Sequence, residues 1–174
     1  MEPGECNHSP CNCLVSLIDT STPGKLYRSC MPRGYHDPDD LVYGLWKTAS
    51  IDVVCALSPP SEFIVKSGED QLLRYEEFGY TVLRGGTEDR ESWKLETLQR
   101  LVDSVHSSLE DGLNVAVHCS AGRGRTGTVI ACLLAKLNTW SEEHALAHVR
   151  QNYSIGPESV VQSESLLAYV EQCC

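Results

Sequence analysis

Positive charge is scarce in this sequence, which has 14 Lys and Arg residues against 24 Asp and Glu and a formal net charge of −10. General nucleic-acid binding is therefore not expected, because it relies on many Lys and Arg side chains that displace counterions. The sequence also lacks any apolar run near the ~18 residues of a membrane span, which argues against membrane insertion. A positively charged pocket on so acidic a surface would instead select one small anionic group.

Targeting features are absent as well. The N-terminal segment "MEPGECNHSPCNC" is acidic and polar, so we expect neither a signal peptide nor a transit peptide. We interpret residues 1–13 as a flexible, cysteine-containing tail and residues 14–174 as a single domain. Without a secretory signal, a reducing compartment is favoured, the cytoplasm or the nucleus, with most thiols free.

Cysteine is abundant, but its nine residues are an odd number with several inside apolar segments, so no disulfide framework is expected. Four tail residues could hold zinc, but their C-x-H-x2-C-x-C spacing differs from the usual zinc motifs, and we predict neither a metal nor another cofactor. Cys173 and Cys174 could carry a lipid, but no polybasic segment precedes them, so we expect no membrane attachment. The four tail residues are Cys6, His8, Cys11 and Cys13.

Apolar runs alternate with amphipathic stretches along the chain, a pattern typical of α/β folds. No repeat or low-complexity segment interrupts it, and we expect a central, mostly parallel sheet flanked by helices. The predicted strands are 14–19, 25–29, 51–58, 80–84 and 113–119. The predicted helices are 37–49, 69–79, 89–111, 127–137, 142–153 after a Ser141 cap, and about 160–171.

The segment Val117–Thr128, "VHCSAGRGRTGT", concentrates glycine, arginine and a thiol between a predicted strand and a predicted helix. Its glycines allow a sharp turn in which successive N–H groups form an anion-binding nest, next to the positive end of a helix dipole. Arg125 can bind two phosphate oxygens with its planar guanidinium. These surroundings stabilise a thiolate at Cys119, and the chemistry they indicate is nucleophilic attack on a phosphate ester.

Three alternative interpretations of this segment are weaker. "GRGRTG" matches the dinucleotide-binding pattern G-x-G-x-x-G, but no second parallel strand with a ribose-binding acid follows. A protease dyad of His118 and Cys119 fails because adjacent residues of a strand point to opposite faces. A purely structural glycine-rich turn leaves the paired arginines unexplained.

The stretch "HCSAGRGRTG" resembles the H-C-x5-R-[S/T] signature of the cysteine-dependent protein tyrosine phosphatases. The short chain is similar to their compact dual-specificity branch, and "GGTED" before a long helix is similar to "GGTPD" of the kinase-associated phosphatase type. The resemblance covers about residues 14–171 in element order. It implies the cysteine-phosphatase fold and a monomer that acts on phosphorylated proteins, including a cyclin-dependent kinase.

The resemblance also implies roles for individual residues. Cys119 would be the nucleophile, and Arg125 would bind the phosphate and the transition state. Thr126 would donate a hydrogen bond to the thiolate, and His118 would hold the loop by hydrogen bonds. The residues implied to cradle the phosphate are Ser120, Ala121, Gly122, Arg123, Gly124 and Thr126.

The general acid is where the sequence departs from the pattern. The family places an Asp directly before the two glycines, but Arg84 stands there, and the nearest carboxylates are Glu88 and Asp89. Asp89 is a candidate for a displaced acid, with a helix N-cap as the alternative role, and Glu88 is a second candidate. If this loop supplies no acid, the chain would be a weak phosphatase or a phosphate-binding pseudo-enzyme, although intact Cys119 and Arg125 favour an enzyme.

Arg123 departs from the pattern too. Tensin-type lipid phosphatases carry a basic residue there, in "KAGKGRTG", so Arg123 could bind a second phosphate on an inositol ring or on a doubly phosphorylated peptide. The alternative is a solvated arginine that only raises the local potential. We prefer a phosphoprotein over a phosphoinositide because the sequence shows no basic membrane-binding face.

Two further residues have open roles. Gln162 corresponds loosely to a glutamine that positions the hydrolytic water in related enzymes, although a position on a helix surface is favoured. Cys55, in a buried strand, resembles the tensin-type cysteine that forms a protective disulfide with the oxidised nucleophile. Its alternative role is that of a small apolar core residue.

Overall fold

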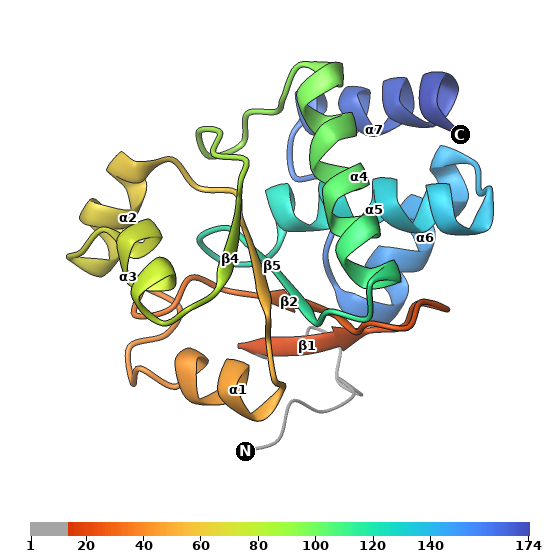
Figure 1. The fold of residues 1–174 in the computed structure, drawn as a ribbon. Coiled ribbons are helices and arrows are strands. Elements are labelled where there is room, and N and C mark those ends of the chain that lie inside the picture. Colours follow the sequence, from red (N-terminus) through yellow and green to blue (C-terminus); the bar gives the residue numbers. More distant parts are fainter. Residues whose placement is uncertain (1–13) are drawn as a thin grey trace.

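The computed structural model describes residues 14–174 (Figure 1). The predicted N-terminal tail and its four potential zinc ligands lie outside the described residues. Within residues 14–174, no helix has both the length and the apolar character needed to cross a membrane.

A five-stranded sheet forms the centre of the fold, with the strand order β1-β2-β5-β3-β4. Its neighbours pair in parallel, except that β1 and β2 are antiparallel. The predicted central, mostly parallel sheet is therefore confirmed. The strands are β1 Val15–Ile18, β2 Leu26–Ser29, β3 Val53–Ala56, β4 Thr81–Arg84 and β5 Val115–His118.

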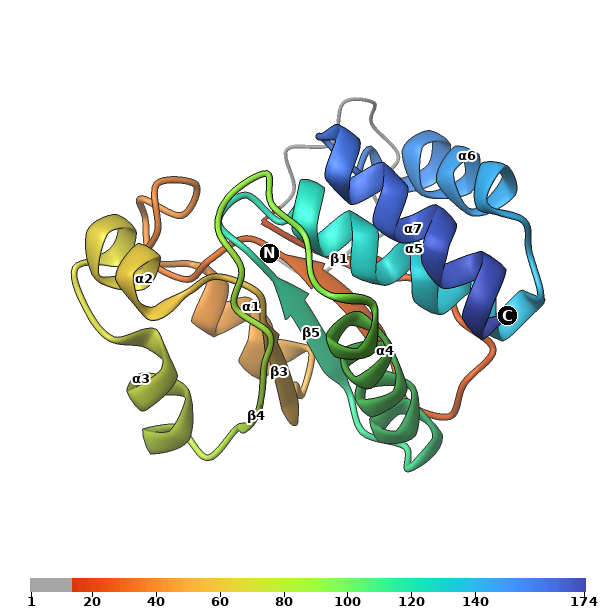
Figure 2. The same ribbon diagram turned by 90° about the horizontal axis from the view of Figure 1, so that it is seen from above.

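Helices cover both faces of the sheet, with α1, α2 and α3 on one side and α4 to α7 on the other (Figure 2). The alternation of side chains along β3 feeds both layers: Val53 and Cys55 join the α4–α7 core, whereas Val54 and Ala56 join the other. The helices are α1 Val42–Thr48, α2 Pro60–Ser67, α3 Gln71–Glu77, α4 Leu95–Glu110, α5 Gly124–Asn138, α6 Glu142–Tyr153 and α7 Val160–Cys173.

Several helix boundaries differ from the prediction. The helix expected from residue 37 begins at Val42, because the Asp37 carboxylate accepts the backbone N–H groups of Leu41 and Val42 in a preceding turn. The helix expected from residue 89 begins at Leu95. Helix α2 was not predicted, since its Pro-rich start is typical of a turn. The Ser141 cap is confirmed, because its hydroxyl accepts the N–H of His144 at 3.3 Å.

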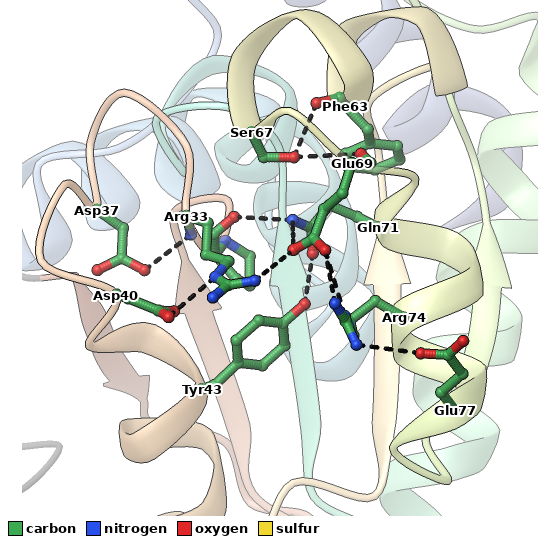
Figure 3. A network of polar contacts seen from close by, with 11 residues as sticks. Arg33, Asp37, Asp40, Tyr43, Phe63, Ser67, Glu69, Gln71, Arg74 and Glu77 are labelled. Carbon is green, nitrogen blue, oxygen red and sulfur yellow. Dashed lines mark hydrogen bonds and ion pairs between the residues drawn. The ribbon is translucent and has the colours of Figure 1, made fainter.

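A polar network centred on Glu69 holds the loop after β2 against α3 (Figure 3). The Glu69 carboxylate accepts hydrogen bonds from Arg33 at 3.0 Å and Arg74 at 2.9 Å. Gln71 donates to the carbonyl of Pro32 and accepts from the hydroxyl of Tyr43. Although burial opposes the effect, the hydrogen bonds from the two arginines lower the pKa of Glu69. The network fixes the loop that lies next to the glycine-rich segment.

Candidate active site

The glycine-rich segment connects β5, the middle strand of the sheet, to α5. It lies at the carboxyl ends of parallel strands, where ligands bind in open α/β sheets. Gly122 has a φ of +69°, and a Cβ there would lie 2.2 Å from the carbonyl oxygen of Ser29. Gly127 lies against Gly156, whose nitrogen would be 2.1 Å from an added Cβ. Both close approaches require glycine.

Cys119 follows β5 directly and is 3% exposed, one turn before α5 begins at Gly124. The residues between them, 120–123, form the turn that the sequence predicted as an anion nest. The carbonyl of Ser120 accepts the N–H of Met31 at 3.0 Å, so this carbonyl is directed toward the neighbouring chain segment.

Arg28, which sequence analysis missed, lies beneath this turn in β2. Its Nη1 donates to the carbonyl oxygens of Ala121 at 3.4 Å and Gly122 at 3.3 Å, and its Nε donates to the hydroxyl of Ser16. The side chain is 2% exposed. Because the carbonyls of the turn are bound from below, its N–H groups are free to face a ligand on the other side. The sequence signal that could have identified Arg28 is an arginine inside a predicted strand that otherwise has the pattern of a buried strand.

Arg125 is held end-on by Glu62 of α2, a second residue that sequence analysis missed. Its Nη1 and Nη2 donate to the two oxygens of Glu62 at 2.7 and 2.8 Å, and Nη1 also donates to the carbonyl of Thr87 at 2.8 Å. Lys66 lies 2.9 Å from the same carboxylate. Nε of Arg125 is buried and makes no hydrogen bond to any residue of the described range 14–174. Its N–H is the guanidinium donor left for a phosphate.

The ionisation of this pair is set by its contacts. Although burial opposes the effect, hydrogen bonds from Arg125 and Lys66 lower the pKa of Glu62 to about 2. Against the effect of burial, the hydrogen bonds that Arg125 donates to Glu62 likewise raise the pKa of Arg125. The guanidinium is therefore charged throughout the physiological range.

His118 connects the turn to α3. Its Nδ1 lies 3.1 Å from the carbonyl oxygen of Cys119, and its Nε2 lies 3.0 Å from the hydroxyl of Tyr75. Because a carbonyl only accepts, Nδ1 carries the proton and Nε2 accepts from Tyr75. Burial lowers the pKa of His118 to about 4, so the ring is neutral at physiological pH. A role in holding the loop stays a prediction.

The hydroxyl of Thr126 is buried and has no hydrogen-bond partner among residues 14–174. The bond that the family resemblance implies, from Thr126 to the sulfur of Cys119, is therefore not formed in this structure. A buried donor without a partner costs about 1–3 kcal/mol. Nε of the adjacent Arg125 is likewise buried and without a partner among the described residues.

The loop after β4 brings one of the two candidate acids to the site. Asp89 lies 3.2 Å from Nη2 of Arg125, and its side chain is 65% exposed. Since α4 begins six residues later, with Lys94 at its N-cap position, the N-cap interpretation of Asp89 is wrong. Glu88 is exposed, and Arg84 forms a surface ion pair with Glu76.

Gln162 is buried, not on a helix surface, and that preferred interpretation is wrong. It lies in the first turn of α7 and is 1% exposed. Its amide donates to the carbonyl of Glu91 at 3.1 Å and accepts the N–H of Glu158 at 2.9 Å. Its oxygen would lie 3.0 Å from a Cβ at Gly124, so Gln162 closely approaches the start of α5.

Arg123 lies at the rim of a cavity of about 260 Å³ between the glycine-rich turn and the segment joining α6 to α7. Arg150 lines the same cavity and donates to the carbonyl of Pro157 at 3.3 Å. Two guanidinium groups thus line one recess beside the candidate phosphate site.

Cys55 lies on β3, where it pairs with Val117, two residues before Cys119. With strands about 4.8 Å apart and a rise of about 3.3 Å per residue, this register places the two Cα atoms about 8 Å apart. A disulfide needs about 7 Å or less, so the strand ends would have to move. Burial raises the pKa of Cys55 to about 12. The disulfide stays a prediction.

A family model described as "Polymorphic toxin system, DSP-PTPase phosphatase" matches residues 41–138, more than half of the chain. The chain belongs to this phosphatase family. The matched region includes Glu62, the candidate acid loop and the whole glycine-rich turn, so the family assignment rests on the segments that form the site.

Curated relatives match stretches of different length. The chain is 32% identical over 77 residues to the phosphatidylglycerophosphate phosphatase PTPMT1 of Arabidopsis thaliana, covering 44% of this chain. It is 26% identical over 155 residues to protein tyrosine phosphatase domain-containing protein 1 of Danio rerio, covering 68% of this chain. The chain spans only 22% of the length of each relative.

Solved structures share the fold over most of the chain. The crystal structure of Tk-PTP in its active form has a TM-score of 0.73 and 26% identity, over 86% of this chain and 93% of that one. Kinase-associated phosphatase also has a TM-score of 0.73, over 85% of this chain and 86% of that one, but at 19% identity. That second likeness shows the fold alone, so the kinase-associated type stays a prediction.

Proposed function

We propose that this chain hydrolyses phosphotyrosine, phosphoserine and phosphothreonine in proteins through a cysteinyl-phosphate intermediate on Cys119. The observation that carries the proposal is the position of Cys119 at the mouth of the glycine-rich turn, beside an arginine that is buried, charged and fixed end-on by Glu62. We further propose that the site of this small domain is shallow enough to admit the short phosphoserine side chain as well as phosphotyrosine.

The reaction follows from this geometry in two steps. The N–H groups of the turn and the Nε–H of Arg125 bind the phosphoryl oxygens, and the Cys119 sulfur attacks phosphorus as the ester P–O bond breaks. Asp89 donates its proton to the leaving oxygen. Water then attacks the phosphocysteine and gives a proton back to Asp89, which releases inorganic phosphate and the thiolate.

The acid role of Asp89 gives a prediction about leaving groups. Asp89→Asn should lower the turnover of alkyl phosphates by about 10²–10⁴, with a much smaller effect on activated aryl phosphates, because only a basic leaving oxygen needs a proton. The measurement is the dependence of kcat/KM on leaving-group basicity, with Glu88→Gln as the matched control. An unchanged dependence in Asp89→Asn, with an altered one in Glu88→Gln, would assign the acid to Glu88.

A second candidate function follows if neither carboxylate acts. Arg84 occupies the usual acid position and is paired with Glu76, which favours a weak phosphatase or a phosphate-binding protein. Two results together would support this candidate over the efficient enzyme. Rates of the unaltered protein would already fall steeply with leaving-group basicity, and neither substitution would change them.

The class of substrate is part of the proposal. The acidic chain, with its net charge of −10, supports a phosphoprotein over a phosphoinositide in an anionic membrane. The relative named as a phosphatidylglycerophosphate phosphatase supports the lipid alternative. Parallel assays on phosphopeptides and phosphoinositides, with and without chelator, separate the two. We further propose that the chain acts as a monomer, in the cytoplasm or nucleus, on partners that include a cyclin-dependent kinase.

Arg123 and Arg150 predict a preference for substrates with a second phosphate. Arg123→Ala should raise KM about tenfold for doubly phosphorylated peptides, the loss expected for one charge-assisted hydrogen bond, and less than about twofold for singly phosphorylated ones. Arg100→Ala, which removes an exposed arginine on α4, is the matched control. An equal loss on both kinds of substrate would make Arg123 a general electrostatic contributor.

A further inference from the structure

A cavity of about 380 Å³ lies between α7, the start of α4 and the residues that follow Asp89 in the loop. We call it the α7 groove. Apolar residues line it on both walls, and it has room for a bulky apolar side chain. The lining residues are Glu91, Ser92, Trp93, Leu95, Leu98, Val161, Glu164, Ser165 and Ala168.

Two carboxylates flank this apolar lining. Glu91 stands on the loop and Glu164 on α7, and both are exposed. Neither forms an ion pair with another residue of the described range 14–174. Charged groups at an apolar site favour a partner of opposite charge, so the groove is complementary to a segment in which Lys or Arg adjoins a bulky apolar residue.

One wall of the groove is formed by the loop that carries Asp89. Ser92 donates to the hydroxyl of Ser165 at 2.6 Å, and Ser159 donates to the carbonyl of Arg90 at 2.6 Å. Trp93 is fixed by its own bond to the carbonyl of Gly85 at 2.7 Å. Side-chain hydrogen bonds therefore attach this wall of the groove to α7 and to the segment after β4.

The distance to the phosphate site sets which segment can reach the groove. Asp89 contacts Arg125, and Ser92 lies three residues further along the loop. At about 3.5 Å per residue, the Cα atoms of Asp89 and Ser92 are at most about 11 Å apart. An extended peptide spans that distance in three to four residues.

We propose that the α7 groove binds the phosphoprotein substrate itself, through a bulky apolar residue next to a Lys or Arg, about three to five positions from the phosphoresidue. The inference rests on the proposed function, because the occupant belongs to the substrate of that site. It makes the groove a determinant of substrate selection, separate from the recess lined by Arg123.

The test uses synthetic phosphotyrosine peptides with the pair Leu-Arg, Ala-Arg or Leu-Glu placed four residues before or after the phosphotyrosine. For one of the two placements, before or after the phosphotyrosine, we expect the Leu-Arg peptide to have a KM about tenfold lower than the Ala-Arg and Leu-Glu peptides, at similar kcat. Val161→Asp should abolish the benefit of Leu, and Glu164→Lys should transfer the preference to Leu-Glu. Both variants should hydrolyse p-nitrophenyl phosphate at the rate of the unaltered protein.

The matched control is Asp111→Lys, which makes the same change in net charge at the other end of α4, about 24 Å from Leu95. It should leave all KM values unchanged. Equal KM values for all three peptides in both directions, with normal p-nitrophenyl phosphate turnover, would overturn the proposal for the groove and leave the proposed function intact.

A binding measurement tests the groove even if the chain hydrolyses no phosphate ester. Tryptophan fluorescence should still change when the Leu-Arg peptide binds beside Trp93, and the change should be absent in Glu164→Lys. Two results would assign the groove to another occupant and overturn the proposal: a dimer in sedimentation that Val161→Asp dissociates, or binding to phosphatidylserine vesicles that Val161→Asp abolishes.

Discussion

Cys119→Ser should abolish the turnover of p-nitrophenyl phosphate while leaving phosphopeptide binding intact. The substitution removes the nucleophilic sulfur, for which loss of turnover by about 10⁴-fold or more is expected in a covalent mechanism. It leaves Arg28, Glu62 and Arg125 unchanged, and serine fits a site that is 3% exposed. Steady-state rates and calorimetric titration with a phosphotyrosine peptide measure the two effects separately.

Cys174→Ser is the control, because Cys174 is exposed at the far end of α7. It should retain full activity. Turnover near that of the unaltered protein in Cys119→Ser would end the cysteinyl-phosphate proposal, whatever the binding data show. Loss of both binding and turnover would show that the sulfur also holds the cradle in shape, and would contradict the expectation of separable roles.

Glu62→Gln should have the second-largest effect, on stability as well as on activity. Removing one partner of a buried ion pair costs about 3–5 kcal/mol, because the buried Arg125 keeps its charge and loses the carboxylate that binds both of its Nη atoms. Turnover should fall by about 10²–10³, since the guanidinium loses the fixed orientation on which transition-state binding depends. Urea denaturation and kcat/KM measure the two losses.

Lys66→Ala is the matched control for Glu62→Gln. It removes the other cation that contacts Glu62 and leaves the pair of Glu62 with Arg125 intact. The Lys66 side chain is 21% exposed. Its cost in stability should stay below about 1 kcal/mol. An equally small cost for Glu62→Gln would contradict the role assigned to the pair.

The same pair predicts how stability depends on pH. The pKa of Glu62 is lowered from 4.5 to about 2 by folding, so the unfolded chain takes up its proton first. The stabilisation, of order 3 kcal/mol, is present above pH 4.5 and is lost as the pH falls toward 2. This part of the acid transition should be missing in Glu62→Gln.

The sequence predicted the features that depend on local pattern. The strands and the nucleophile loop were predicted because short apolar runs and a ten-residue motif carry their own signal. Glu62 and Arg28 were not predicted, because they reach the loop from 63 and 94 residues away. A carboxylate in a short Pro-capped helix and an arginine in a strand look ordinary until the fold brings them to one point.

The start of α4 shows a second limit. Apolar spacing continues from Trp93 into the helix, so the pattern alone extends it to residue 89. In the structure Arg90 has a φ of +65°, which ends helical geometry, and its carbonyl accepts from Ser159. Long-range hydrogen bonds from α7 thus override the local periodicity, and they place Asp89 beside Arg125 instead of at a helix cap.

The nucleophile and the candidate acid stand on elements of very different local stability. Cys119 lies between β5 and α5, whose residues 124–135 are all buried, so we expect amide protons there to be among the slowest in the domain to exchange. The segment 88–91 is exposed and is held to α7 by a few side-chain hydrogen bonds. Loss of these few bonds would withdraw Asp89, which is already 65% exposed, from Arg125 without unfolding the glycine-rich turn, so the acid can leave and return within the lifetime of one folded molecule.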